Sequence, residues 1–368
     1  MLMVIPSELS DGNYPFTAGT SLVYRGASAR DRVRLEIKNG IPTFMRASDD
    51  ANKCVAFIGY LLPNGDVALA GTVFFLIRPL NFPNSNLCYA VTARHVIQGI
   101  ESMGQTTCVI RMNTHRGSAV NVEIPIESWW FHPDESEVDV AATIFALDPQ
   151  HDFLGIFVDN LVTDPPNPIH DIGIGDEVYL AGLFANRAGK EKNIPIIRVG
   201  NIAAMPDPKE RILTRMGFME AYLIEVRSLG GLSGAPVFVN LGLLRKMGGQ
   251  FAYSTLPHGT AYMIGLMHGH YDMEVIAPNE GDQARKAVER INKGIGIVVP
   301  SHKILEVLNQ PMVKEFEQKV EQGLRERELP TADSLVTETE PFTREVFEDA
   351  LKRASRRVSQ PDEEKKET

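Results

Sequence analysis

The sequence predicts an all-β protein with two β-barrels and a mainly helical C-terminal tail. From about Cys54 to Pro300, short β-branched or aromatic runs alternate with Gly, Pro and Asn, which is the pattern of an all-β sandwich or barrel. A proline-rich stretch at residues 163–171 divides these runs into two halves of comparable length and suggests a linker between two barrels. After Ser301 the apolar spacing becomes helical.

The expected strands follow one another along the two halves. They are VAFIGYLL, AGTVFFLIR, LCYAVTA, CVIRM, VDVAATIFAL, DEVYLAGLF, PIIRVGNIAA, AYLIEV, APVFVNL, AYMIGLMH and GIGIVVPS. The predicted domains are an N-terminal extension (1–53), a first β-barrel (54–160), a second β-barrel (161–300) and a helical, partly disordered tail (301–368).

The tail carries apolar residues at helical spacing. They are Val313, Phe316, Val320 and Leu324. A further helix is expected after Pro341, and the last residues, SQPDEEKKET, have the composition of a disordered segment. Packing of these helices against the barrels is the favoured interpretation, and recruitment of a regulatory partner is the alternative.

Composition excludes several kinds of partner. The net charge of -10 disfavours binding to nucleic acid or anionic lipid, because both attract basic surfaces. No apolar run approaches the roughly 20 residues of a membrane helix. The N-terminal residues lack a basic region and are interrupted by Pro6, so they read as a poor secretory signal. Three cysteines, an odd and low number, fit a reducing compartment, and a cytoplasmic location is expected.

The chemistry of acyl transfer by serine needs a hydroxyl, a base, an acid that orients the base, and donors for the oxyanion. Ser233 lies in SLGGLSGAPVF, where nearby glycines allow a tight turn. The backbone N–H groups of Gly231 and Ser233 are the expected oxyanion donors. His95 follows an apolar strand in YAVTARHVI, and Asp139 opens the apolar run VDVAATIFAL. A carboxylate at such a buried position needs a hydrogen-bond partner.

These motifs carry a family resemblance. AVTARHVI resembles the histidine motif of trypsin-like serine peptidases, DVAATIF their aspartate strand, and GLSGAPVF their nucleophile turn. The order is His, Asp, Ser, with spacings of 44 and 94 residues that are also similar to the family's. An α/β-hydrolase has the order Ser, Asp, His and needs a helix directly after the serine, where this chain has Pro236 and an apolar strand.

The resemblance covers about residues 56–308 and implies two six-stranded antiparallel barrels of the trypsin type. IGDEVYLAGL, RVGNIAA and GIGIVVPSHKI resemble the HtrA-like branch, although no PDZ-like segment follows. It implies a serine endopeptidase in which His95 is the general base, Asp139 orients it and Ser233 is the nucleophile. A protein or peptide is the implied substrate, and no cofactor is expected.

Two positions depart from the family. Leu232 stands where zymogen-activated members place an aspartate that pairs with a new N-terminus, so activation by that ion pair is not expected. Ala235 replaces the second glycine of the Ser-Gly-Gly-Pro turn. This exchange of one small residue for another should preserve the turn.

The resemblance also places two residues at the substrate cleft. Arg227 falls at the floor of the primary specificity pocket, where a cation would favour an acidic side chain before the scissile bond; the alternative is that it points to solvent or pairs with Glu225. His268 is expected to touch substrate or the Asp139 side. His268 and His270 alternate along one strand, but no cysteine or clear acidic residue accompanies them as a third ligand, so no metal is expected.

Two other functions use the same residues. A catalytically silent trypsin fold could act as a binding or scaffold module. An esterase or acyltransferase would use the same nucleophile, base and oxyanion donors.

Overall fold

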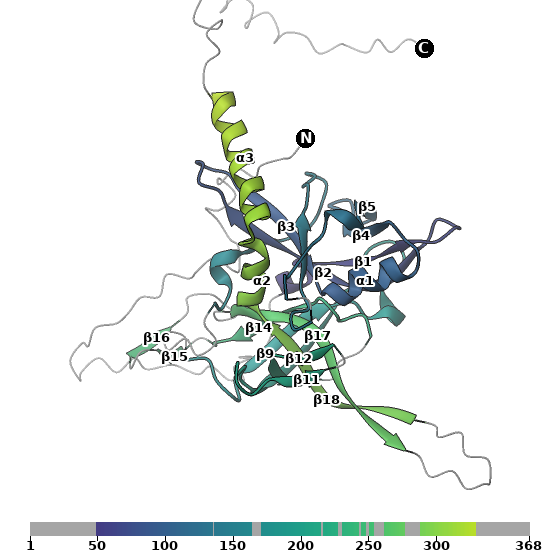
Figure 1. Cartoon of the computed structure of the whole chain (residues 1–368), viewed down its shortest axis with the longest axis vertical. Coiled ribbons are helices and arrows are strands. Elements are labelled where there is room, and N and C mark those ends of the chain that lie inside the picture. The colour runs from purple at the N-terminus through teal and green to yellow at the C-terminus, as the bar shows by residue number, and fades with distance from the viewer. Residues whose placement is uncertain are drawn as a thin grey trace, which may run out of the picture. The chain divides into compact units, whose positions relative to one another are not determined.

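The computed structural model describes residues 49–328, except 135, 164–170, 215, 227–229, 243, 248–249, 254–260 and 277–287. The chain divides into two units, residues 1–319 and 320–368. All described strands, α1 and α2 belong to the first unit, and α3 crosses the boundary. Strands dominate this first unit, as the sequence predicts (Figure 1).

The second half of the β region forms a closed antiparallel barrel in the order β10, β13, β18, β17, β14, β9. These strands are β9 (Glu177–Gly182), β10 (Ile196–Ala204), β13 (Tyr222–Glu225), β14 (Pro236–Asn240), β17 (Ala261–Ile276) and β18 (Val288–Pro300). Alternate apolar side chains fill the barrel, among them Leu180, Ile224 and Val237. The β17–β18 ladder continues beyond the barrel to the pair Ile276 and Val288 (Figure 1).

The first half forms an eight-stranded sheet in the order β5, β4, β1, β2, β3, β7, β6, with β8 parallel to β2. These strands are β1 (Val55–Leu61), β2 (Val67–Pro79), β3 (Asn86–Thr92), β4 (Thr107–Asn113), β5 (Ala119–Pro125), β6 (Trp130–Phe131), β7 (Ala141–Ile144) and β8 (Ile156–Phe157). Within the described residues no ladder joins β5 to β6. The prediction of two closed barrels is therefore confirmed for the second half only.

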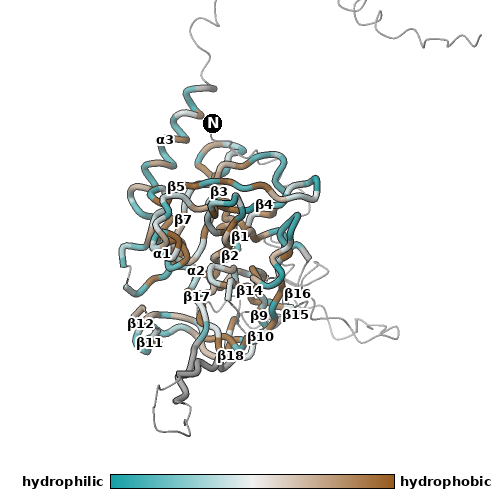
Figure 2. Tube along the Cα trace, turned by 90° about the vertical axis from the view of Figure 1, so that its right-hand side faces the viewer, coloured by the Kyte–Doolittle hydropathy of each residue, from teal (hydrophilic) through white to brown (hydrophobic). Residues whose placement is uncertain are grey.

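Each of the eleven expected apolar runs contains a strand. The strands that were not expected are short or polar. They are β5, β6, β8 and the two hairpins β11 (Ile212–Thr214) with β12 (Gly217–Met219) and β15 (Leu244–Met247) with β16 (Gln250–Tyr253). Most residues of β5 are at least partly exposed, so its sequence lacks the apolar run that marks a buried strand. Figure 2 shows the hydrophobic stretches concentrated in the strands of the large sheet and the barrel.

Three α-helices are described. They are α1 (Arg94–Ser102), α2 (Ser301–Leu308) and α3 (Pro311–Glu328). The expected helical spacing of the tail is confirmed for α2 and α3, whereas α1 was not expected. The helix expected after Pro341 and the disordered end lie outside the described residues. None of the described helices has the length and apolarity that crossing a membrane requires.

The first part of α3 packs on the large sheet, in agreement with the favoured interpretation of the tail. The Tyr89 hydroxyl donates to Glu317 Oε1 at 2.5 Å, and the Phe316 ring lies 6.3 Å from that of Trp130. Val313 is fully buried.

Candidate active site

His95 and Asp139 meet at the N-terminus of α1. His95 is the second residue of the helix, and no side chain of the preceding residue caps it. Asp139 Oδ1 accepts the backbone N–H of His95 at 2.8 Å, and Asp139 Oδ2 lies 2.6 Å from His95 Nδ1. A carboxylate is favourable here because the first N–H groups of a helix have no partner within it. The fold therefore supplies the partner that the sequence requires for a buried Asp139.

The Asp139 carboxylate is held in its charged form. Its side chain is 0% exposed, and burial alone would raise its pKa, but the hydrogen bonds from His268 and His95 hold the pKa of Asp139 below its usual range. An ionised carboxylate can only accept hydrogen bonds, so the Nδ1 atom of a neutral His95 carries the proton. His95 Nε2 then has a free lone pair, which is the state required of a general base.

Ser233 sits in a tight turn that requires glycine at two positions. The N–H of Ala235 donates to the carbonyl of Leu232 at 2.9 Å, and Gly231 and Gly234 have φ angles of +100° and +84°. A Cβ on Gly234 would lie 2.2 Å from the Thr72 carbonyl oxygen. Only glycine fits such a backbone and such a close approach.

Thr72, which sequence reasoning missed, holds this turn from the large sheet. Its N–H donates to the carbonyl of Ser233 at 2.9 Å, and its hydroxyl donates to the carbonyl of Gly231 at 2.8 Å. The same hydroxyl accepts the N–H of Leu183 at 2.9 Å. Thr72 thus ties both ends of the turn to the opposite half of the molecule. Nothing in the sequence marks it, because threonine is an ordinary strand residue.

The Ser233 hydroxyl donates to the carbonyl of His268 at 3.3 Å. No described hydrogen bond joins it to His95. The backbone of Ser233 nevertheless lies near α1, since a Cβ on Gly71 would be within 3.1 Å of both the Val96 side chain and the Ser233 carbonyl. The structure brings the serine turn next to the helix of His95 with its hydroxyl turned toward β17.

The expected oxyanion donors are the N–H groups of Gly231 and Ser233. Within the described residues, neither N–H donates a backbone hydrogen bond. The other substrate-side prediction, Arg227, lies outside the described residues.

His268 lies against Asp139. Its Nδ1 is 2.5 Å from Asp139 Oδ2, and its ring is 5.4 Å from that of His95 in an edge-to-face arrangement. The sequence leaves open whether His268 touches substrate or the Asp139 side. In the structure its side chain contacts Asp139. His270, the other histidine of this strand, is not part of this cluster.

Three ligand atoms for a metal meet here, one each from His95, Asp139 and His268, all within 4.8 Å of one another. The fold supplies the third ligand that the sequence of β17 lacks. However, ligands around a tetrahedral zinc at about 2.1 Å lie roughly 3.4 Å apart. The two N···O distances of 2.6 and 2.5 Å are well below this spacing and close to the range of charge-assisted hydrogen bonds, about 2.7–2.9 Å. Protons, rather than a metal, fit the spacing of these atoms.

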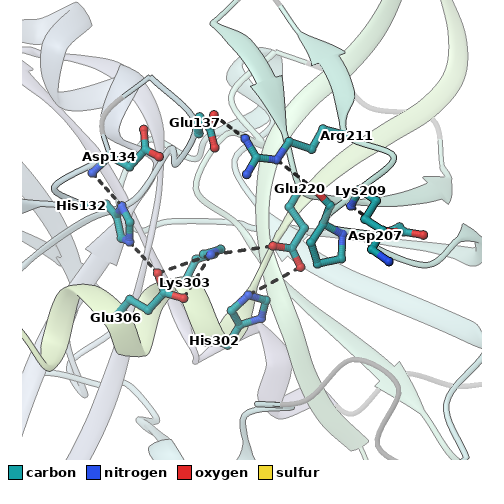
Figure 3. A network of polar contacts seen from close by, with 11 residues as sticks. His132, Asp134, Glu137, Asp207, Lys209, Arg211, Glu220, His302, Lys303 and Glu306 are labelled. Atoms are coloured by element: carbon teal, nitrogen blue, oxygen red, sulfur yellow. Dashed lines mark hydrogen bonds and ion pairs between the residues drawn. The ribbon is translucent and has the colours of Figure 1, made fainter.

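The loop that carries Asp139 is anchored at both ends. At one end His132 Nδ1 accepts the N–H of Asp134 at 3.0 Å, so Nε2 donates to Glu306 of α2 at 2.7 Å. At the other end Glu137 pairs with Arg211, beside the β11–β12 hairpin. Figure 3 shows this network. The loop is thus fixed both to α2 and to the barrel half.

The same network continues from α2 into the barrel. Lys303 lies 3.1 Å from Glu306 and 3.8 Å from Glu220, and His302 lies 3.7 Å from Glu220 (Figure 3). Burial alone would raise the pKa of Glu306, but the hydrogen bonds from His132 and Lys303 hold that pKa below its ordinary value.

Comparison with known proteins adds no relative. No family model and no curated protein sequence matches this chain.

Proposed function

We propose that this protein is a serine endopeptidase that cleaves peptide bonds through an acyl-enzyme on Ser233. The observation that carries the proposal is the contact of His95 with a fully buried, ionised Asp139. A buried carboxylate that fixes the tautomer of a histidine whose side chain is 36% exposed is the arrangement that general-base catalysis by histidine requires. The glycine-dependent turn at Ser233 is the second support.

The reaction begins when the Ser233 hydroxyl leaves the carbonyl of His268 and turns to His95 Nε2. His95 takes the hydroxyl proton as the Ser233 oxygen forms a bond to the peptide carbonyl carbon. The resulting oxyanion is bound by the N–H groups of Gly231 and Ser233. His95 then gives its proton to the leaving amine as the C–N bond breaks. Water, deprotonated by His95, then attacks the carbonyl carbon of the acyl-enzyme. The ester bond breaks, the acid product leaves, and His95 returns the proton to the Ser233 oxygen.

The proposed fold is the trypsin type, in which the large sheet corresponds to the first barrel. The sequence motifs are most similar to those of the HtrA-like branch. The closed second barrel and the position of His95 and Asp139 in the other half support it. The proposed substrate is a protein or peptide, without cofactor, nucleic acid or membrane, and the proposed location is the cytoplasm. The tail is proposed to carry any regulatory partner site.

A catalytically silent binding module is the second candidate. One observation favours it: the described hydrogen bond of the Ser233 hydroxyl goes to the carbonyl of His268 and not to His95. Such a module keeps the fold but cleaves nothing. An esterase or acyltransferase would use the same residues as the proposed peptidase and would differ from it only in the acyl donor or acceptor.

Hydrolysis of an unfolded protein and of a peptide library tests the proposal. Wild-type protein should cleave both, while Ser233→Ala and His95→Ala should lose cleavage and remain folded by circular dichroism. Ser102→Ala is the matched control, because Ser102 is an exposed serine at the end of α1. Absence of cleavage in wild type favours the silent module, and cleavage of esters alone favours the esterase.

A further inference from the structure

His268 contacts the three residues of the proposed catalytic machinery. Its side chain reaches Asp139, its carbonyl accepts the Ser233 hydroxyl, and its ring lies edge-to-face with that of His95. Its side chain is only 12% exposed.

The backbone of β17 is built to aim this side chain. The register of β17 against β18 shifts between Met267 and Gly269, so His268 occupies a β-bulge, a device that redirects a side chain. The residue before it is fixed on the nucleophile turn, because Met267 accepts the N–H of Gly234 and donates to the carbonyl of Ala235, both at 2.8 Å. His268 is therefore placed relative to Ser233 by the barrel itself.

Asp139 needs this second imidazole. The carboxylate is fully buried, and a buried charge is costly unless its lone pairs are hydrogen-bonded. The His95 N–H serves one oxygen, and both imidazoles serve the other. Because the carboxylate is ionised, both imidazoles present Nδ1–H to it. Without His268, the carboxylate would keep only the two hydrogen bonds from His95, and Oδ2 would have a single donor.

We propose that His268 is a positioning residue of this site: its Nδ1–H fixes the Asp139 carboxylate, which in turn fixes the orientation and tautomer of His95. The inference rests on the proposed peptidase function and adds a fourth residue to it. In this role His268 does not exchange protons with substrate, and it does not bind metal.

Nuclear magnetic resonance of ¹⁵N-histidine-labelled protein tests the contact directly. Imidazole N–H protons that donate to a carboxylate resonate far downfield, and the wild type should show two, one lost in His95→Ala and the other in His268→Asn. The control His270→Asn should keep both. A wild type in which His268 shows no such proton overturns the inference, whatever the activity of the protein.

Reaction of Ser233 with a fluorophosphonate tests the role. His268→Leu removes the donor and should lower the second-order rate constant by about 10- to 100-fold, the effect of losing one hydrogen bond to a charged group. His268→Asn places an amide N–H near the position of Nδ1 and should stay within about threefold of wild type. His270→Leu is the matched control and should react at the wild-type rate.

Three results separate the possibilities. If wild type reacts and His268→Leu reacts equally fast, His268 has no positioning role although the proposed function stands. If His268→Asn is as inactive as His95→Ala, His268 is itself the base and the inference is wrong. A wild type that does not react at all removes the proposed function and the role with it, while the resonance measurement still reports whether the contact exists.

Discussion

At the scale of single residues, Asp139 combines full burial with three hydrogen-bond donors. Its depressed pKa means that it stabilises the fold above the ordinary aspartate pKa of about 4 and loses this contribution as pH falls through its lower folded pKa. The Asp139 carboxylate should therefore stay ionised in the folded protein near neutral pH.

Asp139→Asn should fold but lose about 10⁴-fold in turnover near pH 7, because an amide can stabilise the wrong tautomer of His95. Turnover of a peptide substrate and circular dichroism measure the two effects. Asp148→Asn, outside the site, is the control. Near-wild-type turnover in Asp139→Asn would remove Asp139 from the proposed triad.

Thr72→Val removes a buried hydroxyl that bonds Gly231 and Leu183. The unpaired backbone groups should cost about 1–3 kcal/mol in the free energy of unfolding, and peptide hydrolysis should fall because the serine turn loses a support. Thr72→Ser keeps the hydroxyl and should retain most of the activity. Denaturant unfolding and hydrolysis rates measure both; equal stability and activity of the valine variant would show that the turn needs no such support.

The sequence identifies those site residues that have a motif and misses those that act only through the fold. His95, Asp139 and Ser233 stand in recognisable patterns, and the structure brings His95 and Asp139 into contact. Thr72 carries no pattern, and the role of His268 depends on a β-bulge, whose register no periodicity reveals. The hydroxyl direction of Ser233 depends on rotation about a single bond, which sequence does not encode.

At the scale of elements, α2 and the β11–β12 hairpin hold the loop that delivers Asp139 (Figure 3). Glu306→Gln should destabilise the protein at pH 7 by no more than about 1 kcal/mol, since the Glu306 side chain is 43% exposed and solvent screens its pairs.

The pH dependence of this variant has a defined sign. Because the folded pKa of Glu306 is depressed, its charge stabilises wild type above the unfolded pKa of about 4.3 and ceases to do so as pH falls through the folded pKa. The difference in unfolding free energy between wild type and Glu306→Gln should therefore shrink from pH 7 to pH 3, as measured by denaturant titration. A difference that grows on acidification would contradict the proposed ion pair.

The attachment of α3 to the large sheet depends on a buried carboxylate. Glu317 accepts the Tyr89 hydroxyl and lies near Arg78 and Lys314. Tyr89→Phe leaves Glu317 with one donor fewer and should lower the unfolding free energy by about 1–3 kcal/mol. Thermal and denaturant unfolding measure it, with Tyr60→Phe, at a half-buried tyrosine of β1, as the control. No loss of stability in Tyr89→Phe would mean that the helix is held by apolar packing alone.

At the scale of the whole molecule, the apolar runs were sufficient to predict the all-β class and the barrel of the second half. They do not show which edge strands pair in the first half, because most residues of β5 are partly exposed and β6 is only two residues long. The sequence pattern also does not predict helix α1. It is nine residues long, and the apolar run of β3 before it dominates the pattern.

Removing residues 331–368 should leave peptide hydrolysis intact, since every proposed catalytic group and the α3 contacts of Val313, Phe316 and Glu317 lie upstream. Circular dichroism and hydrolysis rates of the shortened protein give the measurement. A folded, inactive product would show that the removed segment helps to shape the site.

The central claim is that Ser233 is an activated nucleophile, and the most direct measurement is the number and position of fluorophosphonate adducts on the native protein. A serine hydroxyl reacts only where a base takes its proton, so mass spectrometry should find one adduct per chain, on the peptide that contains Ser233. Ser233→Ala, His95→Ala and heat-denatured protein should carry none. An adduct on another serine, or an unlabelled wild type whose triad and oxyanion donors are aligned in a crystal structure, would contradict the account.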